Sequence, residues 1–169
     1  MNTLWPALIA AVAALGGVTV GALVEPLKLS AARRARARQE HGERCARFVE
    51  AATSSRSGVI RLNVAHRRVK VGGEEVSADE ILALETAYYT ARNELRQVAG
   101  LIDLYGPDEL AHQAFAVREA DRQFRRKQWI VEDSGVLDRS DLPPGVRDYA
   151  TAMENEIRKF TALARKSMS

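Results

Sequence analysis

Residues 77–110 decide the fold, and they read SADEILALETAYYTARNELRQVAGLIDLYGPDEL. Apolar side chains recur in this stretch in alternating steps of three and four residues, the period of a helix face that packs against other helices. Ser77 and Glu80 have the spacing of a capping box, in which each side chain pairs with a free backbone N–H at the helix start. The apolar face consists of Ile81, Leu84, Tyr88, Ala91, Leu95, Val98, Ile102 and Tyr105.

A second helix is predicted directly after Gly106-Pro107, with Pro107 at its first helical position. Asp108 and Glu109 stand in its first turn, where negative charge complements the helix dipole. Because the Gly-Pro connection is short, the two helices are predicted to be antiparallel neighbours. The second apolar stripe consists of Leu110, Ala114, Val117, Ala120 and Phe124.

Two more helices flank this pair. One runs from about residue 30 to residues 53–57, and its continuation to Arg68 stays open because residues 53–58 are poor helix formers. The other begins near Pro144, after a loop over residues 135–145. The predicted fold is all-α, an antiparallel bundle of about four helices formed by residues 71–169 and part of 28–70. The apolar stripe of the first of these helices consists of His41, Cys45, Phe48, Val49 and Ala52. That of the helix beginning near Pro144 consists of Val146, Tyr149, Met153, Ile157, Phe160 and Ala164.

Residues 69–76 have a competing interpretation as a β-hairpin, since Gly72-Gly73 can support a tight turn. Two isolated strands of three residues would be barely stable in water. A loop between helices is therefore predicted here, while the sequence leaves open whether residues 53–76 are helical, looped or disordered.

The N-terminus carries a long uncharged stretch. Residues 1–24 hold no charged side chain, and residues 4–24 are almost all apolar. As a helix with a rise of ~1.5 Å per residue, this run would span roughly 31 Å, the thickness of a bilayer's hydrocarbon core. It predicts a transmembrane anchor over residues 1–27. A cleaved signal peptide is the alternative, although no Lys or Arg precedes the apolar run.

The charge distribution orients this predicted anchor. Residues 28–70 hold 12 Lys and Arg against 3 Glu, a net +9, whereas residues 71–169 hold 13 against 18 acids, a net −5. Positive charge beside a span marks its cytoplasmic end, so we expect a single-pass protein in the cell membrane with the N-terminus outside and the C-terminal domain in the cytoplasm. The residues expected at the membrane surface are Lys28, Arg33, Arg34, Arg36 and Arg38.

Gly17 and Gly21 form a small-xxx-small pattern with Ala13, which lets two helix backbones approach closely. Self-association through these glycines is the resulting hypothesis. The basic residues 28–70 also suit a nucleic acid, because cations neutralise phosphates. No aromatic side chains are interleaved with the arginines of 30–47, so nucleic acid is the less favoured partner.

The sequence contains no constellation typical of catalysis. Glu109 and His112 have the spacing of a di-iron ligand pair, but such sites need a second copy of the motif. Cys45 is the single cysteine and lies in an apolar stripe, so a buried core position is expected rather than an activated nucleophile. No catalytic, cofactor-binding or metal-ligating residue is predicted, and no cofactor. One cysteine also agrees with a reducing compartment.

Arg125, Arg126 and Lys127 are the most basic point of the C-terminal half, with Trp129 close behind. They are candidates for contact with an acidic partner, and Trp129 offers a stacking surface. The alternative is a solvated helix end whose cations complement the dipole.

The whole layout is similar to one type of protein. The uncharged N-terminal run, the Arg-rich stretch 33–38 and the helix–Gly-Pro–helix joint of 101–110 resemble the small membrane-anchored helical proteins common in high-GC Gram-positive bacteria. The resemblance implies an all-α protein, and it transfers no site residues because such proteins mostly lack an assigned activity.

The predicted function is a non-enzymatic, membrane-tethered helical module that engages an unknown protein partner or a second copy of itself. Two alternatives stay open. One is a membrane-active effector, associated with a mobile element or defence system, that acts by oligomerisation. The other is a membrane-tethered nucleic-acid binder that uses residues 28–70.

Overall fold

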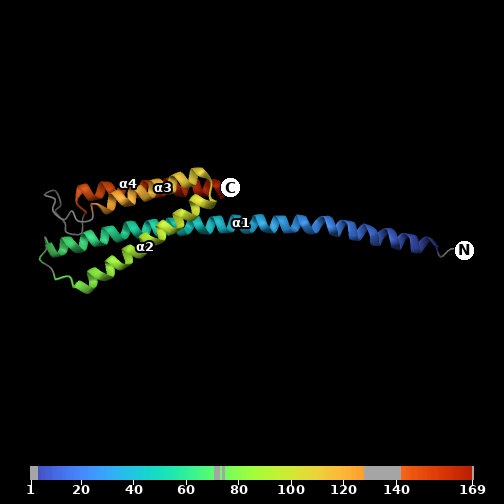
Figure 1. Ribbon diagram of the computed structural model, residues 1–169, viewed down its shortest axis with the longest axis horizontal. Coiled ribbons are helices and arrows are strands. Elements are labelled where there is room, and N and C mark those ends of the chain that lie inside the picture. Colours follow the sequence, from blue (N-terminus) through green and yellow to red (C-terminus); the bar gives the residue numbers. More distant parts are fainter. Residues whose placement is uncertain (1–3, 71–72, 74, 128–141, 169) are drawn as a thin grey trace. The chain divides into compact units, whose positions relative to one another are not determined.

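The computed structural model describes residues 4–70, 73, 75–127 and 142–168, with side chains from residue 28 onward. These residues form four helices and no strand: α1 (Leu4–Lys70), α2 (Ala78–Tyr105), α3 (Asp108–Arg125) and α4 (Pro144–Met168) (Figure 1). The prediction of an all-α fold is confirmed. The chain divides into two compact units, Met1–Glu40 and His41–Ser169, and the helical bundle belongs to the second.

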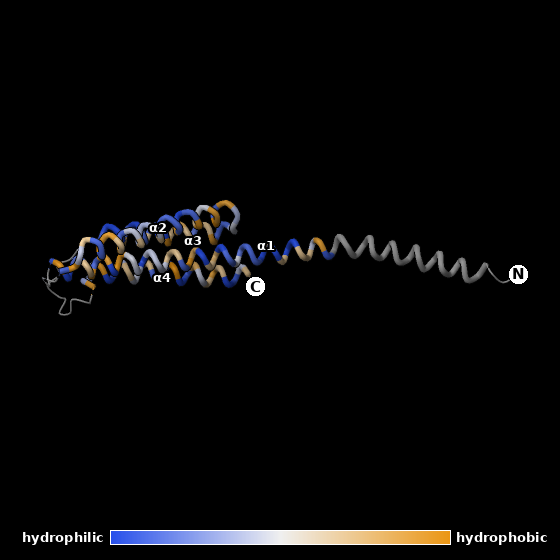
Figure 2. Tube along the Cα trace, turned by 90° about the horizontal axis from the view of Figure 1, so that it is seen from below, coloured by the Kyte–Doolittle hydropathy of each residue, from blue (hydrophilic) through white to orange (hydrophobic). Residues whose placement is uncertain are grey.

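The bundle core is built from one apolar stripe of each helix. Orange and blue segments alternate along α2, α3 and α4 in Figure 2, as expected for helices with a single apolar face. The rings of Phe48 on α1 and Phe160 on α4 pack with their centroids 4.3 Å apart. The largest fully buried side chains are Tyr88, Phe48, Phe124, Phe160, Leu95, Ile102, Leu110, Met153, Val59, Val98, Val117 and Val146.

Helix α1 continues through residues 53–58, the stretch whose helicity the sequence left open, and ends at Lys70. Two tertiary contacts stabilise it there. The buried hydroxyl of Ser55 donates a hydrogen bond to Asp121 Oδ1 at 2.6 Å. Gly58 lies so close to Tyr88 that an added Cβ would be 3.0 Å from the Tyr88 Cβ. These contacts outweigh the weak intrinsic helix propensity of the stretch.

The start of α2 is as predicted, because the Glu80 backbone N–H donates to Ser77 Oγ at 3.1 Å. The Glu80 carboxylate lies 3.9 Å from the Arg68 guanidinium. Two details of the prediction are wrong. Tyr105 is 64% exposed rather than buried, and Pro107 caps α3 from outside the helix, which begins at Asp108.

The β-hairpin alternative is excluded at its first residues, since Val69 and Lys70 belong to α1. Of the alternative's Gly72-Gly73 turn, Gly72 lies outside the described residues and Gly73 has a φ of 64°.

The predicted localisation requires a correction. Among the residues whose side chains the structure describes, no helix is both long and apolar enough to cross a membrane. This finding contradicts the prediction of a single-pass membrane protein with a cytoplasmic domain. In the second unit the reason is physical, because the apolar side chains of each helix form one stripe that the bundle buries. The side chains of residues 4–24, including Gly17 and Gly21, lie outside the described residues.

Candidate functional site

Two pairs of arginines face one another across the α2–α3 hairpin. Arg92 and Arg96 lie one helical turn apart on α2, as do Arg118 and Arg122 on α3. Arg92 and Arg122 each stand 15 residues from Pro107, and Arg96 and Arg118 each stand 11 residues from it. In an antiparallel hairpin, residues equally far from the turn lie level with one another. The four arginines line a pocket of about 260 Å³ together with Leu95, Phe115, Glu119 and Asp121.

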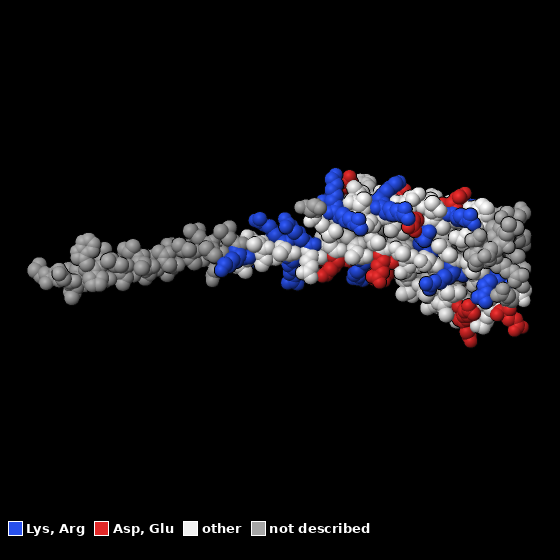
Figure 3. Space-filling view, turned by 180° about the vertical axis from the view of Figure 1, so that it is seen from behind, with Lys and Arg blue, Asp and Glu red and all other residues white. Residues whose placement is uncertain are grey.

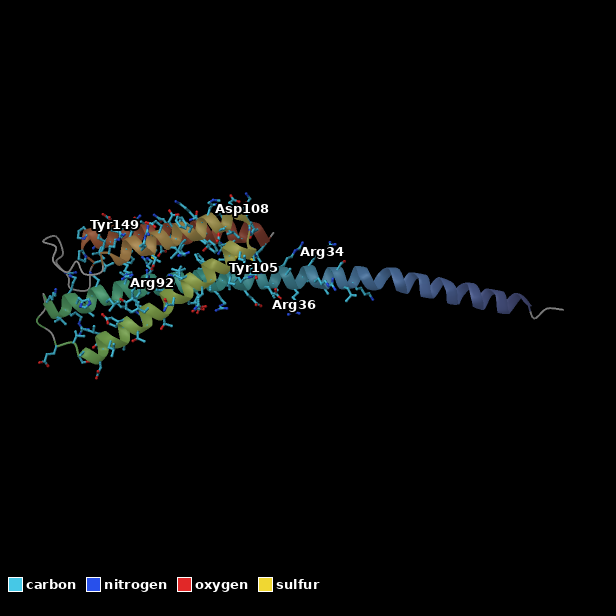
Figure 4. All side chains as sticks on the ribbon, viewed as in Figure 1. Arg34, Arg36, Arg92, Tyr105, Asp108 and Tyr149 are labelled. Atoms are coloured by element: carbon cyan, nitrogen blue, oxygen red, sulfur yellow. The ribbon has the colours of Figure 1, made fainter. Side chains whose placement is uncertain are left out.

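The inner wall of this arginine pocket is a buried polar network. Asp121 is only 3% exposed, and its carboxylate accepts hydrogen bonds from Ser55 Oγ at 2.6 Å and Arg92 Nε at 3.3 Å. The Arg92 side chain, labelled in Figure 4, is 18% exposed. The network joins α1, α2 and α3, and it holds the Arg92 guanidinium in place with its charge balanced.

Tyr88 lies beside this network. Its buried hydroxyl has no hydrogen-bond partner among the described residues. Burial, followed by the negative charge of Asp121, raises the pKa of Tyr88 well above its ordinary value. The phenol therefore stays protonated at neutral pH.

In the outer part of the pocket, positive charges outnumber negative ones. Arg122 forms an ion pair with Glu119, and hydrogen bonds from Arg122 and Gln123 lower the pKa of Glu119. Arg96 and Arg118 are exposed, and within the described part of the chain neither has a hydrogen bond or an ion pair. Two of the four guanidinium groups are thus left without a balancing charge.

A second hollow lies on the other side of Phe115, between α3 and α4. This α3–α4 groove has a volume of about 800 Å³, and its small apolar residues are Ala116, Ala120 and Ala152. Phe115 lines both the groove and the arginine pocket, and its side chain is 66% exposed. The exposed phenylalanine and the neighbouring alanines together offer an apolar surface to a partner.

Two acids and two bases also line the groove: Glu119, Glu156, Arg158 and Lys159. Glu156 accepts hydrogen bonds from Lys159 Nζ and Gln113 Nε2, each at 2.7 Å. These two bonds lower the pKa of Glu156. The groove is therefore close to neutral overall, unlike the arginine pocket.

The cations predicted at a membrane surface are all exposed on α1, in the unit Met1–Glu40. Arg34 and Arg36 point to opposite sides of the helix in Figure 4, and Arg36 Nε pairs with Glu40 Oε1 at 2.9 Å. In Figure 3 the cations and anions of the bundle occur side by side on the visible face.

The predicted partner contacts around the end of α3 are only partly accessible. Arg125 is half-buried, Arg126 is exposed at the C-cap, and Lys127 Nζ lies 5.2 Å from the centroid of the Tyr149 ring on α4. Trp129 lies outside the described residues. Arg125, Arg126 and Lys127 do not line the arginine pocket.

Cys45 is 2% exposed, which confirms the predicted core position. The structure adds a contact that the sequence did not suggest: Cys45 Sγ lies 3.8 Å from His41 Nε2, and the same nitrogen lies 3.1 Å from Ser167 Oγ on α4. Burial raises the pKa of the Cys45 thiol, so the reactive thiolate is disfavoured.

His112, whose spacing from Glu109 matches a di-iron ligand pair, contacts its own helix. His112 Nδ1 lies 2.8 Å from the Asp108 carbonyl oxygen within α3. Across the described residues, no group of three or more His, Cys, Asp or Glu side chains is arranged to hold a metal ion.

Comparison with protein families, curated proteins and solved structures finds no match to this chain. The resemblance to small membrane-anchored helical proteins therefore stays a prediction, and function is inferred from the site itself.

Sequence reasoning missed the four pocket arginines because it looked for consecutive basic residues. A signal was present, namely two Arg-x₃-Arg patterns placed symmetrically about Gly106-Pro107.

Proposed function

We propose that this chain is a non-enzymatic helical interaction module, which pairs with a second copy of itself through the α3–α4 groove. The observation that carries the proposal is Phe115, which is 66% exposed beside a groove of small residues. A bundle with many other buried apolar side chains leaves this ring in water, where it costs free energy.

The surface is complementary to itself. Phe115 is a protruding side chain, and Ala116, Ala120 and Ala152 are small enough to receive one. In a two-fold symmetric contact the same patch serves both copies, so each Phe115 enters the groove of the other chain. Helix ridges that fill helix grooves are the ordinary way in which α-helices pack.

The charges of the groove support a second copy over a strongly acidic or basic partner. Each charged side chain of the groove has a partner of opposite sign in its own chain: Glu156 pairs with Lys159, Glu119 with Arg122 and Arg158 with Glu154. A two-fold axis can place the acids of one chain against the bases of the other, whereas like charges opposite one another would oppose association.

Sedimentation velocity of the full chain tests the proposal. We expect a concentration-dependent dimer, and we expect Phe115→Ala to weaken it. Burying one phenylalanine side chain stabilises by about 2 kcal/mol. Two copies contribute about 4 kcal/mol, so the dissociation constant should rise on the order of 1,000-fold.

Leu104→Ala is the matched control. Leu104 is as exposed as Phe115, at 69%, but it does not line the α3–α4 groove. Its variant should dimerise like the wild type. A dimer that persists in Phe115→Ala but is lost in a Gly17→Leu, Gly21→Leu variant would refute pairing through the groove and favour the N-terminal glycines.

Of the two alternatives, the membrane-active effector required the predicted span and is withdrawn with it. A nucleic-acid binder would use the basic residues 28–70, whose cations in 28–38 are exposed. No aromatic side chain lies among these cations to stack on bases, so nothing specific favours this function over pairing.

A further inference from the structure

We infer that the arginine pocket between α2 and α3 binds the phosphate group of a small phosphorylated molecule. The inference does not depend on the pairing of two chains, because Arg92, Arg96 and Arg118 do not line the α3–α4 groove.

The net positive charge of the arginine pocket favours a phosphate ligand. Four guanidinium groups line the pocket, and only two carboxylates, those of Glu119 and Asp121, lie among them. Each carboxylate is already paired, Glu119 with Arg122 and Asp121 with Arg92. The remaining two positive charges match a phosphate monoester, which carries a charge of about −1.5 to −2 at neutral pH. A single carboxylate would balance only half of them.

The positions of two guanidinium groups in the pocket also favour phosphate. Arg96 and Arg118 stand level on opposite sides of the pocket and have no partner among the described residues. Guanidinium groups donate two parallel N–H bonds to oxyanions, and phosphate has enough oxygens to accept from both sides at once.

The other two arginines of the pocket are already restrained by acid partners. Arg92 is fixed by the buried Asp121, and Arg122 by Glu119. Because their acid partners already restrict these side chains, binding would cost less conformational entropy than it would for free surface arginines.

The volume of the pocket favours a small phosphorylated molecule. At about 260 Å³ the pocket is slightly below the range of about 300–1,000 Å³ that is common for organic ligands. It suits a phosphate with a small organic group rather than a complete nucleotide. Leu95 adds an apolar lining for that group.

Isothermal titration calorimetry of the full chain tests the inference. The probes are inorganic phosphate, phenyl phosphate and acetate. We expect saturable binding of both phosphates, tighter for phenyl phosphate, and at least tenfold weaker binding of acetate. Phenyl phosphate should also bind more tightly at pH 7.5 than at pH 5.5, because its second proton is lost near pH 6.

Variants locate the site. Arg96→Ala and Arg118→Ala should each weaken binding about tenfold or more, while Arg96→Lys should retain part of the affinity because it keeps the charge but not the two-pronged donor. Arg61→Ala is the control, since Arg61 is exposed on α1 and does not line the pocket.

Three results would overturn the inference: no saturable binding of phenyl phosphate, equal affinity for acetate, or an equal loss of affinity in Arg61→Ala and Arg96→Ala. A wild-type chain that is monomeric yet binds phosphate as expected would refute only the proposed pairing. Both alanine variants remove exposed side chains that have no partner among the described residues, so their urea denaturation midpoints should match that of the wild type.

Discussion

At the scale of single residues, the buried carboxylate of Asp121 is a feature that the helical period did not reveal. Asp121 stands at a position of the α3 stripe where an apolar residue is expected, and it is buried. Its carboxylate is acceptable there because Ser55 and Arg92 both donate to it. A buried charge needs such partners, since desolvation is otherwise too costly.

Replacing this carboxylate should therefore be strongly destabilising. We expect Asp121→Ala to lower the free energy of unfolding by about 3 kcal/mol, because it leaves the Arg92 guanidinium without its partner in a partly buried site. Ser55→Ala should cost about 2 kcal/mol, because the lost hydrogen bond is made to a buried charged group. Urea denaturation followed by circular dichroism measures both.

Asp103→Ala serves as the control, because Asp103 is exposed on α2. Its effect should stay within about 0.5 kcal/mol. If Asp121→Ala were as mild as this control, the buried network would not stabilise the bundle.

His66 predicts a pH dependence. Burial, with the nearby Lys70 charge, lowers the pKa of His66 from 6.5 despite the opposing effect of Glu85. The unfolded chain therefore binds the proton more readily than the folded chain, so stability should be fully present above pH 6.5 and fall as the pH drops below it. Urea midpoints at pH 7.5 and 5.5 should show this loss.

His66→Gln should reduce the difference between those two midpoints. The lowered pKa values of Glu119 and Glu156 act in the same direction, but in a lower window, below their ordinary value of 4.5. An unchanged difference in His66→Gln would show that other groups cause the loss.

At the scale of helices, two glycines in helix interiors have opposite surroundings. A Cβ added at Gly58 would lie 3.0–3.2 Å from three atoms of Tyr88, one of them backbone Cα, whereas a Cβ at Gly100 would have nothing within 4 Å. Alanine favours a helix by about 1 kcal/mol over glycine. At Gly58 the clash at the α1–α2 contact should exceed this gain.

Gly58→Ala is accordingly expected to lower the free energy of unfolding by about 1 kcal/mol or more, and Gly100→Ala to raise it by up to about 1 kcal/mol. Urea denaturation of the pair gives the answer. Stabilisation by both substitutions would mean that α1 and α2 do not cross closely at Gly58.

The helices themselves were predictable from sequence for a clear physical reason. Period, caps and the Gly-Pro joint are local signals, and they placed α2, α3 and α4 within a few residues of their observed bounds. Contacts between distant residues were not predictable in this way. Ser55 meets Asp121 across 66 positions, and that contact keeps α1 helical where local propensity is poor.

The arginine pocket was predictable in its spacing but not in its charge pairing. Its arginines are spaced symmetrically about the turn, and this spacing is visible in the sequence. Consecutive cations are a more obvious pattern, and they pointed to Arg125, Arg126 and Lys127 instead. Which side chains keep a free charge depends on tertiary partners. Within the described part of the chain, Arg96 and Arg118 have no acidic partner while Arg92 and Arg122 are paired, and no local pattern encodes that difference.

At the scale of the whole molecule, the second unit combines a well-buried core with an outward surface centred on Phe115. One side of Phe115 is a positively charged pocket, and the other is a nearly neutral apolar groove. This difference in charge supports two distinct roles, anion binding on one side and contact with a second chain on the other.

The most direct test of the central claim is an isotope-filtered nuclear Overhauser experiment on a mixture of ¹³C-labelled and unlabelled full chains. Pairing through the α3–α4 groove predicts cross-peaks between the Phe115 ring of one copy and the methyl groups of Ala116, Ala120 or Ala152 of the other. A dimer in which these cross-peaks are absent, or a chain that stays monomeric at the concentration of the measurement, would contradict it.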